Sequence, residues 1–332
     1  MRGIVIRGSW NIFTVRVLGK ETGETAPGTE VECRIKGKVL KGVEGYYNPL
    51  APGDRVFFEA DPARPGKGFI LSLEERRNVF TRFNQKNLGS HRSAASQLLA
   101  ANVDLVLCVT TPESPPFRPR FLDRALLQAD IAGIPPVILL NKEDLSGGDP
   151  DVEERLEDLR RIGYPLLRVS ALTGAGMDKL RSLISGKISV LVGQSGVGKS
   201  SLIRALIPDR DIRVGSLNEK YDRGNHTTTM SVLLEIPGGE KPADPGEAGG
   251  GTFIIDTPGI RRFVPDGVGK EGLIFYMREF ASLAGKCTYG LSCSHLTEPG
   301  CKILEAVTAG AIHEDRYESF LRIRDELGGK LG

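Results

Sequence analysis

The sequence has no long hydrophobic run. No stretch approaches the ~18 consecutive apolar residues that a transmembrane helix requires. Residues 1–10 also contain no apolar segment long enough for a secretory signal peptide. The absence of both signals predicts a cytoplasmic protein that makes no membrane contact.

Cysteine is scarce, and neither sign of charge is in excess. The chain of 332 residues includes five cysteines, three of which lie with a histidine in one short C-terminal segment. This grouping is typical of a metal site rather than of a disulfide framework. The formal net charge of +2 excludes a polyanion partner for the whole surface, so any nucleic-acid contact must be local. The length predicts two or three domains.

Residues 1–75 have the pattern of a small β-barrel. Short apolar or alternating segments recur about every ten residues and are separated by glycine and proline. These segments are Thr14–Val17, Val31–Ile35, Arg55–Phe58 and Phe69–Leu73. Five strands in this length fit an OB-fold, which often binds oligonucleotides. Five residues form either a charged and aromatic RNA surface or a solvated turn with core aromatics: Lys36, Lys38, Lys41, Tyr46 and Tyr47.

We predict a basic linker over residues 76–100. Between Arg76 and Arg92 the chain has several basic side chains and no acidic one. A flexible segment of like charge commonly follows the phosphates of a nucleic acid. A solvated linker without a nucleic-acid partner is the alternative.

Strand and helix patterns alternate in the central domain, which we place at residues 101–262. Buried strand patterns at 103–110, 136–140, 166–169 and 188–192 are each followed by a helical pattern. This alternation predicts an α/β domain with a parallel sheet and helices on both faces.

The last of these strand patterns leads into G-x-x-x-x-G-K-S, the phosphate-binding loop. Its glycines allow several backbone N–H groups to converge on one phosphate chain, and the following helix N-terminus adds partial positive charge. Lys199 is placed to reach the β- and γ-phosphates, and the Ser200 hydroxyl is placed to bind Mg²⁺. The predicted contacts are Gly193, Gln194, Ser195, Gly196, Val197, Gly198, Lys199, Ser200 and Ser201.

Two further motifs predict recognition of guanine. The strand pattern at 136–140 ends in N-K-x-D, and the one at 166–169 ends in Ser-Ala. The Asp144 carboxylate can accept hydrogen bonds from the guanine ring N–H and amino group, which adenine lacks on that edge. Ligands bind at the carboxyl ends of strands in open α/β sheets, although Asp144 as a helix N-cap is the alternative. The predicted base-binding residues are Asn141, Lys142, Asp144, Ser170 and Ala171.

The remaining parts of a GTPase follow the phosphate loop. Asp256 and Gly259 fit D-x-x-G, with Asp256 holding Mg²⁺ through water and the Gly259 N–H sensing the γ-phosphate. Thr228 lies in a polar loop and can complete the Mg²⁺ shell. The base motifs precede the phosphate loop here, which is the reverse of ordinary GTPases and indicates a circular permutation. Because D-x-x-G leads into the C-terminal segment, we expect loss of the γ-phosphate to move that segment.

Residues 263–332 are predicted to form a small zinc-binding helical domain. Its cysteines and histidine are spaced C-x5-C-x-H-x5-C, which is a complete tetrahedral set for structural Zn²⁺. Free cysteines in a small core are the alternative. The predicted ligands are Cys287, Cys293, His295 and Cys301. Cys33 and Cys108 lie in predicted strands, where we expect buried apolar roles. Arg316, Arg322 and Arg324 face either RNA or solvent.

The permuted motif order, the G-N-H-T-T-T loop, the barrel and the cysteine cluster together resemble the family of ribosome small subunit-dependent GTPase A. The resemblance covers nearly the whole chain. It implies a GTPase that acts late in maturation of the small ribosomal subunit and is stimulated by that subunit. It also implies contacts with ribosomal RNA through the barrel and zinc domains. We expect a monomer.

Two segments depart from that family. The first cysteine spacing is one residue longer, and we expect Gly290 to place the extra residue in a turn. Residues 237–251 form a longer connection, rich in glycine and proline, than the family predicts.

The residue after D-x-x-G is Ile260, which cannot orient water as glutamine does in many GTPases. The resemblance implies that His226 takes this role. Lys199 and Thr228 are the other predicted catalytic residues. His226 as a packing or capping residue is the alternative.

A GTP-gated RNA-binding regulator of translation, not specific to the small subunit, is an alternative function. A P-loop kinase or ATPase is a third, against which Asn141 and Asp144 argue.

Overall fold

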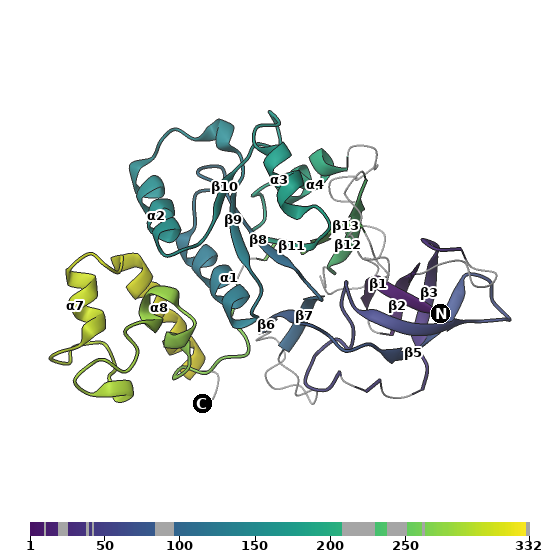
Figure 1. The fold of residues 1–332 in the computed structure, drawn as a ribbon, viewed down its shortest axis with the longest axis horizontal. Helices are drawn as coiled ribbons and strands as arrows, with labels where there is room; N and C mark the ends of the chain where they lie inside the picture. Colours follow the sequence, from purple (N-terminus) through teal and green to yellow (C-terminus); the bar gives the residue numbers. More distant parts are fainter. Residues whose placement is uncertain are drawn as a thin grey trace.

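The computed structural model has three parts in a row, with the α/β domain between the barrel and the C-terminal helices (Figure 1). The structure describes residues 1–9, 11–18, 26–37, 40–41, 43–83, 96–207, 230–237, 251–260 and 263–329. The three-part architecture predicted from the sequence is confirmed.

The first part is a closed barrel of five strands in the order β1-β2-β3-β5-β4. Its strands are β1 (Arg2–Ser9), β2 (Ile12–Leu18), β3 (Glu30–Ile35), β4 (Arg55–Ala60) and β5 (Lys67–Leu73). Buried and exposed side chains alternate along β2, so one face fills the barrel interior with Phe13, Val15 and Val17. Pairing of β4 with β1 closes the barrel and removes the open edges of the sheet.

The described residues of the basic segment 76–100 form strands as well as connections. It contains β6 (Val79–Phe83) and most of β7 (Ser96–Ala101), which pair antiparallel, while residues 84–95 lie outside the described residues. Arg76 makes two hydrogen bonds of 2.7 and 2.8 Å to the buried Asp54 carboxylate. Arg77 pairs with Asp104 at 2.8 Å. These two arginines thus have carboxylate partners within the protein, while the contact of the whole segment with nucleic-acid phosphates stays a prediction.

The barrel contacts the α/β domain through backbone and side chains. The carbonyl oxygen of Ala101 would lie 2.1 Å from a Cβ at Gly53, whose φ is +94°, so only glycine permits this approach. Asn48 exchanges side-chain hydrogen bonds of 3.0 and 3.1 Å with the backbone of Leu98. These contacts attach the barrel to β7 (Ser96–Ala101), which comes directly before the first strand of the central sheet in the chain.

The central sheet has six strands in the order β10-β9-β8-β11-β13-β12. They are β8 (Leu105–Thr110), β9 (Pro136–Leu140), β10 (Leu166–Arg168), β11 (Ile188–Gly193), β12 (Val232–Ile236) and β13 (Thr252–Asp256). Strands β8, β9 and β11 are buried along their length, as strands covered on both faces should be. The sheet is not wholly parallel as predicted, because β12 pairs antiparallel with β13, the next strand in the chain.

Helices cover both faces of this sheet (Figure 1). They are α1 (Pro119–Ile131), α2 (Pro150–Arg161), α3 (Met177–Ile184) and α4 (Lys199–Leu206). Both α1 and α2 begin with proline, and the Asp149 side chain caps α2 by accepting a 3.0 Å bond from the Asp151 N–H. In Figure 1, α1 and α2 lie on the side of the C-terminal helices. Among the described residues, none of the helices is long and apolar enough to span a membrane.

The C-terminal part packs short helices around its own core. Its elements are η3 (Leu273–Phe275), α6 (Arg278–Ala281), η4 (Gly290–Ser292), α7 (Lys302–Thr308) and α8 (Glu314–Gly328). The rings of Phe280 and Phe320 stack with centroids 4.8 Å apart. The His313 side chain caps α8 by accepting a 3.1 Å bond from the Asp315 N–H.

Buried charges join this part to the α/β domain. Asp123 of α1 accepts 2.9 Å hydrogen bonds from Arg155 of α2 and from Arg316 of α8, and Arg316 also binds Glu279. The side chains of Asp123 and Arg316 are each only 1% exposed. Arg316 therefore faces neither RNA nor solvent, which corrects that prediction. Breaking such a pair costs about 3–5 kcal/mol, so we expect the C-terminal helices to move together with α1.

Candidate guanine-nucleotide site and metal centre

Each predicted nucleotide motif follows a strand of the central sheet. Asn141 follows β9, Ser170 lies just beyond β10, Gly193 ends β11 and Asp256 ends β13. Strands β9, β10, β11 and β13 run parallel to one another, so their carboxyl ends meet at one edge of the sheet. The fold thus brings motifs from both halves of the domain to one edge.

Asn141 connects three of these motifs. Its side-chain Nδ2 donates a 2.9 Å hydrogen bond to the carbonyl of Val197 in the phosphate loop, and its Oδ1 accepts one of 3.2 Å from the Ala171 N–H. A Cβ at Gly198 would lie 2.3 Å from Asn141 Nδ2, and Gly198 has φ +92°. Glycine at this position therefore lets the N-K-x-D motif close against the phosphate loop.

Ser170 fixes the orientation of Asp144. Its hydroxyl donates a short hydrogen bond to Asp144 Oδ1, while the Thr173 N–H donates one of 3.1 Å to Ser170 Oγ. Asp144 is otherwise exposed and accessible to a ligand. The motif spacing predicted Ser170 near the base but gave no indication that its hydroxyl would bind Asp144. The Lys142 Nζ donates 2.5 Å to the carbonyl of Ser114, which joins this motif to the loop before α1.

Lys199 lies beneath the phosphate loop. Its side-chain Nζ donates 2.7 Å to the carbonyl of Gly193 and 3.0 Å to that of Gln194. Burial lowers the pKa of Lys199 to about 8, although nearby Asp256 opposes this shift. Ser200 and Ser201 follow in the first turn of α4. Two carbonyl groups of the phosphate loop therefore hold the Lys199 side chain next to the place predicted for a bound phosphate.

The D-x-x-G segment packs against the same loop. A Cβ at Gly259 would lie 3.0 Å from the Cα of Ser195. Within the described part of the chain, Asp256 Oδ1 is buried and has no hydrogen-bond partner. Burial raises the pKa of Asp256 to about 6. A buried carboxylate oxygen without a partner beside a lysine and a serine suits a hydrated Mg²⁺ ion.

We expect the affinity for Mg²⁺ and GTP to be highest between about pH 6 and pH 8. Binding requires ionised Asp256 and protonated Lys199, whose pKa values in the nucleotide-free protein are about 6 and about 8. Below pH 6 the carboxyl gains a proton, and above pH 8 the lysine loses one, so affinity falls by up to about tenfold per pH unit on each side. Titration of a fluorescent GTP analogue from pH 5 to pH 9 measures this. Asp256→Asn should remove the decrease on the acid side only, and an acid side unchanged in that variant would contradict the assignment.

Two predicted catalytic residues, His226 and Thr228, lie outside the described residues. Ile260, which follows D-x-x-G, is 2% exposed, and its N–H donates 3.4 Å to the carbonyl of Gly193. Its buried, apolar side chain cannot hold water, so a water-positioning group must come from another segment.

The four predicted metal ligands come together in the C-terminal part. Cys287, Cys293, His295 and Cys301 are all buried, and their ligand atoms lie within 4.8 Å of one another. His295 Nδ1 lies 3.6 Å from Cys287 Sγ and 3.3 Å from Cys301 Sγ. These separations fit ligands at about 2.0–2.3 Å from one tetrahedral zinc ion. The Lys302 N–H also donates 3.3 Å to Cys287 Sγ, which orients this sulfur.

The longer cysteine spacing is accommodated by a turn. Gly290 has φ +56° and begins η4, and its N–H donates 2.8 Å to the carbonyl of Cys287. The extra residue therefore lies within a tight turn between the first two ligands. Cys33 and Cys108, predicted to be apolar core residues, are buried outside this cluster.

The residues proposed as an RNA surface on the barrel are only partly available. Lys36 pairs with Glu59 at 2.6 Å, and Arg76 lies over the Tyr46 ring at 5.6 Å. Tyr47 remains exposed, and Lys38 lies outside the described residues. The ion pair with Glu59 thus neutralises part of the positive charge with which Lys36 could attract RNA.

The base motifs precede the phosphate loop in the chain and still meet it at one sheet edge, which defines the central domain as that of a circularly permuted GTPase. The RsgA GTPase family model matches residues 73–264, and the chain belongs to this family. The prediction of this family is confirmed.

Relatives and solved structures agree with this membership. The small ribosomal subunit biogenesis GTPase RsgA of Chlorobaculum parvum is 38% identical over 92% of this chain and 93% of its own length. Its counterpart in Porphyromonas gingivalis is 36% identical over 98% of this chain and 97% of its own length. The crystal structure of YjeQ from Thermotoga maritima is 30% identical with a TM-score of 0.67, and covers 99% of this chain and 98% of that one. YloQ, described as a circularly permuted GTPase, shares the fold at 24% identity and a TM-score of 0.62, covering 99% and 95% of the two chains.

Proposed function

We propose that this chain hydrolyses GTP during late maturation of the small ribosomal subunit, binds ribosomal RNA and is stimulated by that subunit. Its membership in the RsgA GTPase family supports the activity, and the names of its relatives support the assembly step. The observation that carries the proposal is the double hydrogen bond of Asn141, which joins the base motifs to the phosphate loop. We place the protein in the cytoplasm as a monomer.

Each group at the sheet edge has a role in this proposal. Asp144, oriented by Ser170, accepts hydrogen bonds from guanine, and Lys199 exchanges its carbonyl partners for phosphate oxygens. Ser200 and Thr228, together with Asp256 through water, would hold Mg²⁺, which would neutralise charge on the phosphates. His226 orients the attacking water, because Ile260 cannot.

The cysteine and histidine cluster holds structural Zn²⁺ in this proposal. Burial of all four ligands and their mutual distances support it. Zinc would fix the loops that carry the ligands, in the part of the chain farthest from the barrel (Figure 1). A GTP-gated regulator of translation remains the alternative function, since it would use the same nucleotide site on another target.

Turnover of GTP with purified ribosomal subunits tests the proposal. We expect small subunits to accelerate hydrolysis by more than about tenfold, because partners that complete a GTPase site have large effects. Large subunits at equal concentration serve as the control and should have little effect. Equal acceleration by both subunits would favour the alternative, and efficient competition by ATP would contradict recognition of guanine.

A further inference from the structure

The D-x-x-G segment leaves the nucleotide site along a closely packed path. The Thr257 hydroxyl donates 2.5 Å to the carbonyl of Leu191 in β11, and the Ile260 N–H approaches the carbonyl of Gly193 at 3.4 Å. The start of this segment is thus attached to the strand that carries the phosphate loop.

A second set of contacts fixes the point where the chain turns toward the C-terminal part. Phe263 is buried, with its ring centroid 6.0 Å from that of Phe80 and 6.2 Å from that of Phe121. The next carbonyl, of Val264, accepts a 3.0 Å hydrogen bond from the Phe83 N–H. Since only residues 260–262 separate Gly259 from Phe263, the position of Phe263 constrains the D-x-x-G segment.

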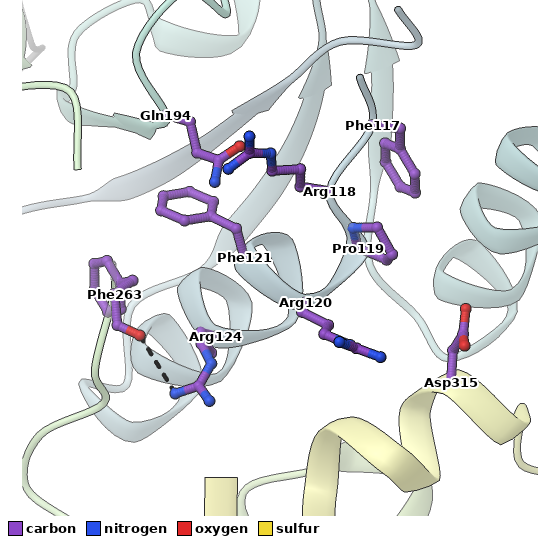
Figure 2. Close-up of a pocket in the computed structure, with 9 residues that line it drawn as sticks. All are labelled: Phe117, Arg118, Pro119, Arg120, Phe121, Arg124, Gln194, Phe263 and Asp315. Atoms are coloured by element: carbon purple, nitrogen blue, oxygen red, sulfur yellow. Dashed lines mark hydrogen bonds between the residues drawn. The ribbon is translucent and has the colours of Figure 1, made fainter. Parts of the chain in front are cut away.

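Arg124 of α1 reaches this point and also the C-terminal part. Its Nη1 donates 3.4 Å to the carbonyl of Phe263, as the dashed line in Figure 2 shows. The same nitrogen makes a short hydrogen bond to Glu326 of α8. The two charged side chains are 18% and 10% exposed, so the pair is stronger than an exposed surface pair would be.

A cavity of about 510 Å³ lies beside this contact. Its lining includes Gln194 of the phosphate loop, Arg124 and Phe263, and Asp315 of α8 on the opposite side (Figure 2). The cavity gives the Arg124 side chain room to leave the Phe263 carbonyl. The arginine therefore has space for a second position if Glu326 no longer holds it.

We propose that Arg124 is a positioning residue for GTP hydrolysis and that Glu326 holds it in place. Through this pair, the C-terminal part contributes to the reaction without touching the nucleotide. Displacement of reacting groups by about 1 Å can slow a reaction about 100-fold, and Phe263 lies close enough in the chain to displace Gly259. The inference rests on the proposed hydrolysis of GTP at this site.

Arg124→Gln and Glu326→Gln test the inference in the full chain without ribosomal subunits. We expect each to lower single-turnover GTP hydrolysis by about tenfold or more, with GTP affinity within about threefold of the wild type. The double variant should be no slower than Arg124→Gln, because both residues act through one contact. The control is Arg120→Gln, one turn earlier on α1, whose exposed side chain pairs with Glu318 at 3.2 Å and should leave hydrolysis unchanged.

A wild-type rate in Arg124→Gln would overturn the inference, and so would an equal loss of GTP affinity, which indicates a distorted pocket. If Arg124→Gln does not fold, the rate of GTP hydrolysis and the GTP affinity of Glu326→Gln test the inference in the same way. A wild-type chain that hydrolyses GTP without a response to small subunits contradicts the ribosomal role alone. A chain with no hydrolysis at all would overturn both proposals.

Discussion

Replacing Cys301 with serine is expected to remove the metal and unfold the C-terminal part of the chain. The four buried ligands lie within 4.8 Å of one another, and the three cysteines belong to the hydrophobic core of the C-terminal part. Structural zinc contributes about 10–16 kcal/mol to folding in small domains of this kind. Serine cannot supply a thiolate, and the remaining three groups bind zinc much less tightly. Zinc content and the thermal unfolding profile measure the effect.

A cysteine outside the cluster provides the matched control. Cys33 is buried in the barrel, and burial raises the pKa of its thiol to about 12, so it is not a thiolate at neutral pH. Cys33→Ala should keep the zinc and lose only a small amount of stability. Absence of zinc from the wild-type protein, with the same unfolding profile in Cys301→Ser, would show that the cluster is a core of free thiols.

Asp144→Asn is expected to change the preferred base from guanine to xanthine. The carboxylate accepts hydrogen bonds from two guanine donors, whereas asparagine opposes the guanine amino group with a donor of its own. Xanthine carries a carbonyl at that position and matches the amide. We expect GTP affinity to fall by at least about 100-fold and xanthosine triphosphate to bind better than GTP. Competition between the two nucleotides measures the change.

The neighbouring acidic residue controls for charge. Glu143 pairs with Arg168 at 3.2 Å and is part of the same motif. Glu143→Gln removes the same charge and should leave the preference for GTP intact. If Asp144→Asn still prefers GTP, the guanine edge is recognised elsewhere.

Strand and helix patterns in the sequence predicted most of the fold, because each pattern depends on residues that are close together in the chain. The strand at 136–140 has the predicted bounds, and a helix follows the phosphate loop as predicted. Strand β1 was not singled out, and β6 and β7 were assigned to a linker, since their pairing partners lie far away in sequence or beyond a basic segment. The positions of the site motifs at one sheet edge followed from strand order, but the bond of Asn141 to Val197 did not.

The motifs of the site were visible in the amino-acid sequence alone: the phosphate loop, N-K-x-D, D-x-x-G and four candidate metal ligands, because each is defined by spacing along the chain. Which charged side chains pair within the protein became clear only from the packing of the folded chain. Arg316 meets Asp123 across 193 positions, and Arg124 meets Glu326 across 202. No local pattern encodes such a pair, because burial and partner arise only when distant helices pack.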